Sequence, residues 1–203
     1  MSNSSPADSP DPTIPAANFF SSCARGLLNV EQSIHAETLI ASLARMSGSL
    51  MFRTFGFNSS IKPGTVVLSD EANTHGPKLM GVMFNTLENL GDHVGKEDLD
   101  SQYMSDKHSQ LNFLESVDRL APSFLKYCQE HSLPLYDAAM AAAVATALCI
   151  HDCRQVLSAN KGASIATYGL IEGAKTAPSM IASPVGSTSA PPQKPKKPWY
   201  QFW

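Results

Sequence analysis

The stretch from residue 136 to residue 150 places the strongest constraint on what this chain can fold into. From Ala138 onward, thirteen residues carry no charge and only one polar side chain, that of Thr146, and seven of the thirteen are alanine. Alanine is the strongest helix former, and Asp137 at the start suits the positive end of a helix dipole. Because polar residues do not recur every third or fourth position, we expect a helix that is buried on all sides.

This helix is too short to cross a membrane. Thirteen residues span about 20 Å at about 1.5 Å per residue, whereas a bilayer's hydrocarbon core is roughly 30 Å thick. The stretch therefore predicts the central helix of a soluble bundle, in which alanine lets neighbouring helices approach closely. We predict an all-α fold of five or six helices around this Ala-rich helix.

The distribution of proline predicts where the folded part begins and ends. Ten of the fourteen prolines lie before Ala16 or after Thr176, in flanks rich in Ser, Pro and Ala that cannot bury enough apolar surface to order themselves. We therefore expect a disordered N-terminal segment (1–15), a helical bundle domain (16–175), and an Ala/Ser/Pro linker with a basic-aromatic tail (176–203).

Apolar periodicity and helix-start signals divide the domain. The four internal prolines mark expected element boundaries, because proline fits the first turn of a helix but not its interior. Ser69 is expected to cap a helix, and Ser47-Gly48-Ser49 favours close packing between two helices. The expected helices are 16–28, 29–55, 69–91 with a break at Gly76-Pro77, 106–131 with a break at Pro122, a central helix from 136 through Leu157 that stops at 160–162, and 165–174.

The charge balance argues against nucleic acid as a partner. The formal net charge is −3, which is not the basic footprint that a nucleic-acid-binding surface requires. Residues 1–175 hold 12 Lys and Arg against all 18 Asp and Glu, whereas the last 28 residues hold three lysines and no acidic residue. The sequence thus predicts a mildly acidic body with a basic tail.

The cysteines and the N-terminus favour a cytoplasmic location. The four cysteines, Cys23, Cys128, Cys149 and Cys153, lie in apolar contexts that read as helical. The N-terminus is polar and lacks the basic-then-apolar run of a secretory signal. A reducing compartment is therefore expected.

One constellation resembles a metal site by its ligand types. Cys128 and His131 lie three residues apart, and Cys149 and Cys153 lie four apart, so on helices each pair would share a face. Three thiolates and an imidazole could hold zinc in a closed tetrahedral site. However, the paired Cys-x-x-Cys spacing that indicates zinc is missing, and free cysteine commonly packs as a small hydrophobe. Core packing is the favoured interpretation, with zinc as the alternative.

The C-terminal tail carries the most distinctive side chains. Both tryptophans of the chain lie in its last five residues. Trp and Tyr dominate the energetics of protein interfaces, so the tail is expected to dock into a partner protein. Docking on its own bundle and binding to a membrane surface with lysines on anionic headgroups remain as alternatives. The residues that would make these contacts are Lys194, Lys196, Lys197, Trp199, Tyr200, Phe202 and Trp203.

These features together favour a non-enzymatic function. We expect a helical structural or adaptor subunit that forms homo-oligomers and docks a protein partner through its tail. Gly-rich phosphate-binding loops and the Gly-x-Ser-x-Gly motif of serine hydrolases are absent from the sequence. The alternatives are a zinc-binding enzyme or sensor that uses the Cys/His cluster, and a peripheral membrane protein anchored by the tail.

Overall fold

The computed structural model describes residues 12–29, 33–57 and 60–179, and this part of the chain is all-α, as predicted. Six α-helices are joined by connections of different lengths: the one between α2 and α3 contains one 3-10 turn, and the longest, residues 90–112, contains three. The helices are α1 (Thr13–Leu27), α2 (Ala36–Phe52), α3 (Asp70–Asn89), α4 (Phe113–Glu130), α5 (Leu135–Asp152) and α6 (Ala159–Lys175).

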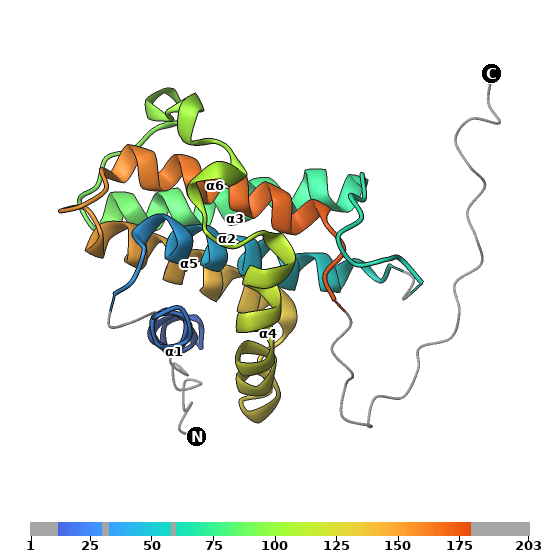
Figure 1. The fold of residues 1–203 in the computed structure, drawn as a ribbon. Coiled ribbons are helices and arrows are strands. Elements are labelled where there is room, and N and C mark those ends of the chain that lie inside the picture. Colours follow the sequence, from blue (N-terminus) through green and yellow to red (C-terminus); the bar gives the residue numbers. More distant parts are fainter. Residues whose placement is uncertain (1–11, 30–32, 58–59, 180–203) are drawn as a thin grey trace, which may run out of the picture.

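Four helices form the body of the bundle. Figure 1 shows α2, α3, α5 and α6 lying side by side along one direction, while α4 runs across them and α1 is seen end-on. α2 packs against all five other helices, most extensively against α6 and α5. None of the helices in the described part is both long and apolar enough to cross a membrane.

The Ala-rich helix is buried, as predicted, but it shares the centre with α2. In α5, ten of eighteen residues are buried, and a partly exposed stripe runs through Tyr136, Met140, Val144 and Leu148. In α2, fifteen of seventeen residues are buried. The burial of α2 is hard to predict from the sequence, because this helix contains serines, a glycine and Arg45, which are polar or small and nevertheless lie inside.

Glycine permits an unusually close contact between α2 and α6. A Cβ atom built on Gly48 would lie 2.5 Å from the backbone nitrogen of Ala174 and from the carbonyl oxygen of Leu170. On α6, a Cβ atom at Gly169 would lie 2.9 Å from that of Ala44, and one at Gly173 would overlap the backbone of Arg45. The expectation that Ser47-Gly48-Ser49 marks close helix packing is therefore confirmed.

Two helices begin at polar residues whose side chains cap the first turn. The Ser69 hydroxyl accepts a hydrogen bond from the Ala72 backbone N–H, which confirms this predicted cap. At α4, Asn112 and Glu115 form a reciprocal capping box. The expected start of this helix at residue 106 is therefore too early.

Several other predicted boundaries are wrong. α1 begins at Thr13, before the predicted domain start at residue 16, and α2 begins at Ala36 rather than at residue 29. α5 ends at Asp152, and the predicted stop at residues 160–162 is instead the first turn of α6. Residues 153–157, where the central helix was expected to continue, instead form the connection between α5 and α6.

Two prolines lie inside helices that were expected to break there. Pro77 lies in α3 and Pro122 in α4, and both are exposed. Each proline removes the hydrogen bond to the carbonyl four residues earlier, at Asn73 and Asp118. Both of these residues are exposed, so water can bond to the freed carbonyls.

The end of α6 and the residues after it form backbone hydrogen bonds with the loop before α3. Val66 and Thr176 form an antiparallel bridge. The Val67 N–H donates to the Lys175 carbonyl (2.7 Å), the Ala177 N–H to the Thr65 carbonyl (2.9 Å), and the Gly64 N–H to the Ala177 carbonyl (2.8 Å). The extended residues 65–67 therefore pair with the chain that follows α6.

Candidate interaction site

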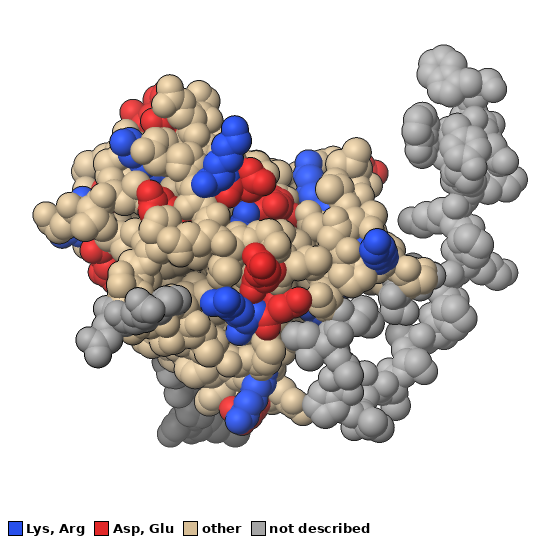
Figure 2. Space-filling view, in the orientation of Figure 1, with Lys and Arg blue, Asp and Glu red and all other residues tan. Residues whose placement is uncertain are grey.

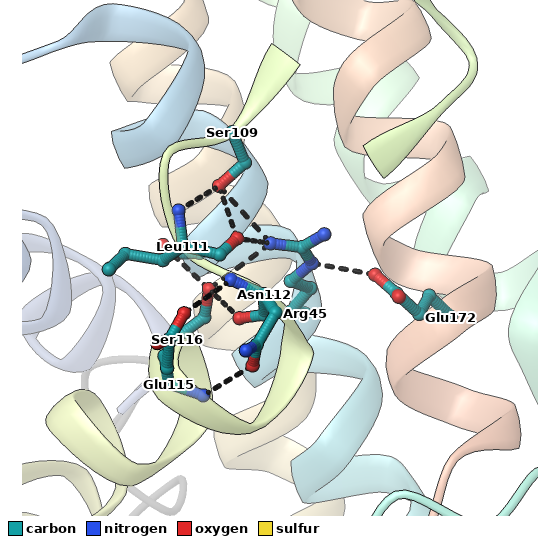
Figure 3. A network of polar contacts seen from close by, with 8 residues as sticks. Arg45, Ser109, Leu111, Asn112, Glu115, Ser116 and Glu172 are labelled. Carbon is teal, nitrogen blue, oxygen red and sulfur yellow. Dashed lines mark hydrogen bonds and ion pairs between the residues drawn. The ribbon is translucent and has the colours of Figure 1, made fainter. Parts of the chain in front are cut away.

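A buried arginine organises the polar contacts of the core. Arg45 extends from α2 and is 1% exposed. Its Nε donates to Glu172 Oε2 on α6 (2.6 Å), and its Nη1 donates to the Leu111 carbonyl (2.6 Å). Figure 3 shows Arg45 lying between α6 and the segment that leads into α4.

Two serines complete this network. Ser109 and Ser116 each accept a hydrogen bond from Arg45 Nη1 at 3.2 Å. Ser109 in turn donates to the Leu111 carbonyl, and Ser116 donates to the Asn112 carbonyl. The guanidinium therefore has one charged and three neutral acceptors, which is how a buried charge is accommodated.

The network supports the two walls of a surface groove. The groove has a volume of about 490 Å³. One wall is α6, with Tyr168, Ile171 and Glu172, and the other is the start of α4, with Phe113 and Leu114. Gly64, Val66 and Thr176 also line the groove. Arg45 bonds to Glu172 in the α6 wall and to the carbonyl of Leu111, which shortly precedes the α4 wall, and so connects the two walls.

The groove is suited to an apolar group rather than to an ion. Its lining is mostly apolar, with Glu172 and Lys175 as charges of opposite sign. Burial raises the pKa of Tyr168, and the neighbouring carboxylates of Glu172 and Asp106 raise it further, so this phenol stays protonated. A protonated phenol, a carboxylate and apolar walls can orient and bury a side chain.

Sequence reasoning did not identify these residues. Arg45 is the only charged residue in the fifteen positions 38–52. A single charge within these fifteen consecutive positions was the available signal that Arg45 is buried and paired. The identity of its partners, far away in sequence, depends on the tertiary fold.

The structure does not gather the four residues of the alternative zinc site into a set of metal ligands. Cys128 is buried in α4, and the exposed His131 caps that helix with its ring 4.2 Å from that of Tyr127. Cys149 lies in α5, and Cys153 is its C-cap. Within residues 12–29, 33–57 and 60–179, no three His, Cys, Asp or Glu side chains converge where they could hold a metal ion.

Cys149 instead packs in a mixed environment at the interface between α1 and α5. It is fully buried, with its sulfur 3.3 Å from Ser21 Oγ and 3.3 Å from Arg25 Nη2. Arg25 also forms an ion pair with Asp152 (2.7 Å). Burial raises the pKa of Cys149 despite the opposing effects of Ser21 and Arg25, so this group stays a protonated thiol. Its contacts with Ser21 and Arg25 join α5 to α1.

Cys128 provides a pH test of the packing interpretation. Burial raises its pKa from 9.0 to about 11. The native state therefore keeps its proton where the unfolded chain loses it, and the stability from this group is complete below pH 9 and declines as the pH rises toward 11. We expect Cys128→Ala to lose less stability than the wild type between these pH values, measured by urea unfolding. Equal losses would show that the thiol is not buried.

The predicted partner-binding residues lie outside the described part of the chain. These are Lys194, Lys196, Lys197, Trp199, Tyr200, Phe202 and Trp203. The structure does describe the chain up to Ser179, which is held by two contacts. The Arg53 guanidinium donates to the Ser179 carbonyl (3.1 Å), and the Ser179 hydroxyl donates to Asp118 (3.1 Å).

Charged side chains do not gather into a patch of one sign on the face shown. Figure 2 shows Lys and Arg interspersed with Asp and Glu over this face of the bundle.

The fold defines this protein as an all-α helical bundle with an apolar groove between α4 and α6. No known family model, curated protein or solved structure matches the chain.

Proposed function

We propose that this protein is a non-enzymatic helical adaptor that self-associates and presents its C-terminal segment to a protein partner. In this proposal the bundle is the scaffold, and residues 180–203 carry the binding determinants. The apolar, helical contexts of the four cysteines support a cytoplasmic site of action.

The observation that carries the proposal is that residues 175–179, which immediately precede the tail, are hydrogen-bonded to the bundle. Three backbone hydrogen bonds join residues 175–177 to 64–67, and Ser179 is bonded to both Arg53 and Asp118. These contacts draw on three separate parts of the bundle. They fix the point from which residues 180–203 depart, which is what a scaffold that presents a binding segment requires.

The composition of the tail supports a protein partner. Trp199, Tyr200, Phe202 and Trp203 follow a cluster of three lysines. Aromatic side chains provide large buried area at low conformational cost and are enriched among the residues that dominate binding energy. An aromatic anchor therefore favours an apolar pocket in another protein.

The proposal predicts a separation between binding and stability. Removing residues 193–203 from the full chain should leave the melting temperature unchanged and abolish co-purification of the partner. Trp199→Ala combined with Trp203→Ala should have the same effect, because the aromatic rings supply the buried area. Affinity purification followed by thermal unfolding of each variant provides both measurements.

The lysines provide the matched control. Replacing Lys194, Lys196 and Lys197 by glutamine should weaken capture only slightly, since burial of apolar surface is little screened by salt. Undiminished capture by the truncated protein would contradict the proposal. A lower melting temperature on truncation would show that the tail docks on its own bundle. Binding to anionic vesicles that depends on the lysines and is lost in 1 M salt would indicate a membrane surface.

A further inference from the structure

A cavity of about 630 Å³ lies at the start of α2 and shares no lining residue with the groove between α4 and α6. Its lining comes from four parts of the chain: the connection between α1 and α2, the first turn of α2, α4 with the segment before it, and the connection between α5 and α6. Small-molecule sites are commonly of this size and combine apolar walls with a few polar groups.

His35 fixes the arrangement of the polar groups on one side of this cavity. Its Nδ1 accepts a hydrogen bond from the Thr38 backbone N–H (3.3 Å) and lies 2.8 Å from Thr38 Oγ1. Because a backbone N–H can only donate, the proton of the neutral ring belongs on Nε2. Nε2 lies 3.0 Å from Glu37 Oε2, so His35 and Glu37 are partners of one another.

Arg119 contributes a charge that is not paired in this way. Its side chain reaches the cavity from α4, and no hydrogen bond or ion pair joins its guanidinium to another residue of the described ranges 12–29, 33–57 and 60–179. Glu115 lies four residues earlier, at the spacing of a helical ion pair, but its carboxylate accepts from the Asn112 N–H (2.8 Å) in the capping box. The guanidinium is therefore available to an anionic group.

Apolar side chains form the rest of the lining, and two of them are exposed to solvent. Val156, between α5 and α6, is 79% exposed, and Ile34, before α2, is 36% exposed. Leu28 and Leu157 lie behind them in the lining and are buried. A molecule that covers Val156 and Ile34 would remove apolar surface from water, which is favourable.

We propose that this cavity binds a small amphiphilic monocarboxylate, with its carboxylate on Arg119 and its apolar part against Ile34, Val156 and Leu157. A guanidinium is planar and presents parallel N–H donors that match the two oxygens of a carboxylate. The inference goes beyond the proposed adaptor function and does not rest on it, because the tail can engage a partner whether or not the cavity is filled.

The charges that line the cavity decide the class of ligand. A cation would have to displace His35 from Glu37 and would be repelled by Arg119, whereas an anion meets a guanidinium that is not already paired. Glu37 opposes a second negative charge, which favours a monoanion over a dianion such as phosphate. The exposed Ile34 and Val156 favour an anion that carries an apolar part.

Octanoate is a suitable probe for the full-length chain. Titration followed by the chemical shifts of the backbone amides should give a dissociation constant on the order of 1 mM, as expected for a ligand of this size. The shifts should cluster at residues 33–38, 110–119 and 156–157 and spare residues 168–176 of the α4–α6 groove. Octanol, which has the same apolar part without the charge, should bind roughly tenfold more weakly.

Variants at the cavity separate the role of charge from that of apolar contact. Arg119→Gln should weaken octanoate binding roughly tenfold and leave octanol binding unchanged, because the amide keeps hydrogen-bond donors but has no charge. Val156→Ser should weaken both ligands. Lys126→Gln is the matched control, since Lys126 is an exposed cation of the same helix with its own partner, Glu130, and this variant should bind octanoate like the wild type.

Several results would overturn the proposal. These are the absence of octanoate binding up to about 10 mM, equal octanoate affinity in the wild type and Arg119→Gln, shifts that locate octanoate in the α4–α6 groove, and phosphate binding as tight as that of octanoate. Tighter octanoate binding after removal of residues 193–203 would show that the chain's own terminal carboxylate occupies the cavity, and would overturn a free ligand. None of these results bears on partner capture by the tail, which is measured separately.

Discussion

Replacing Gly48 by alanine is expected to lower the free energy of unfolding by about 3 kcal/mol, at the upper end of the usual cost of overpacking. The new Cβ atom would lie 2.5 Å from the Ala174 nitrogen and the Leu170 oxygen. Both are main-chain atoms of α6, so no rotation of a side chain can relieve the overlap. α2 and α6 would have to separate along the most extensive helix contact of the bundle.

The matched control is Gly81→Ala in the middle of α3. A Cβ atom at Gly81 would have no neighbour within 4 Å. Alanine is favoured over glycine inside a helix, so this variant should be more stable than the wild type by about 0.5–1 kcal/mol. Urea unfolding of both variants provides the measurement. Similar stability changes in the two would contradict the close approach of α2 and α6.

The fold class was predictable because local signals agree with one another. The run of alanine from Ala138, the apolar helical spacing and the cap at Ser69 all favour helices, and the structure confirms them. Helix boundaries were less predictable. A proline inside a helix costs more when the carbonyl that it frees has no other partner, and the exposure of Asn73 and Asp118 near Pro77 and Pro122 is a tertiary property.

The groove was not predictable from the sequence. Its walls come from α4 and α6, and Arg45, which joins them, lies on α2. The sequence offered one signal, the lone charge of Arg45 among positions 38–52. This signal does not name a partner, because Glu172 lies 127 residues after Arg45.

The second large effect is expected at the ion pair between Arg45 and Glu172. Glu172→Ala should lower the free energy of unfolding by about 3 kcal/mol, because it leaves a buried guanidinium without its counter-charge. This is the lower end of the usual range for a broken buried pair. Glu172 is 21% exposed, so water can partly compensate the charge of Arg45, which is 1% exposed.

The surface pair between Glu88 and His93 provides the control for this variant. Their side chains are 61% and 76% exposed, so the pair is largely hydrated. Glu88→Ala should change stability by less than about 0.5 kcal/mol. A comparable loss of unfolding free energy in Glu88→Ala and Glu172→Ala would indicate that the loss does not depend on the burial of the pair.

A second substitution should restore much of the stability lost in Glu172→Ala. Adding Arg45→Met removes the uncompensated charge and keeps an elongated apolar side chain in the same space, and apolar replacement of a buried ion pair is often close to neutral. The Leu111 carbonyl keeps its hydrogen bond from Ser109, so the double variant does not leave this acceptor unpaired. Urea unfolding of both single variants and the double variant gives the coupling energy. Further destabilisation by Arg45→Met in the Glu172→Ala background would mean that the bonds of Arg45 to Ser109, Leu111 and Ser116 outweigh its charge. The arginine would then hold the α4 wall of the groove independently of α6.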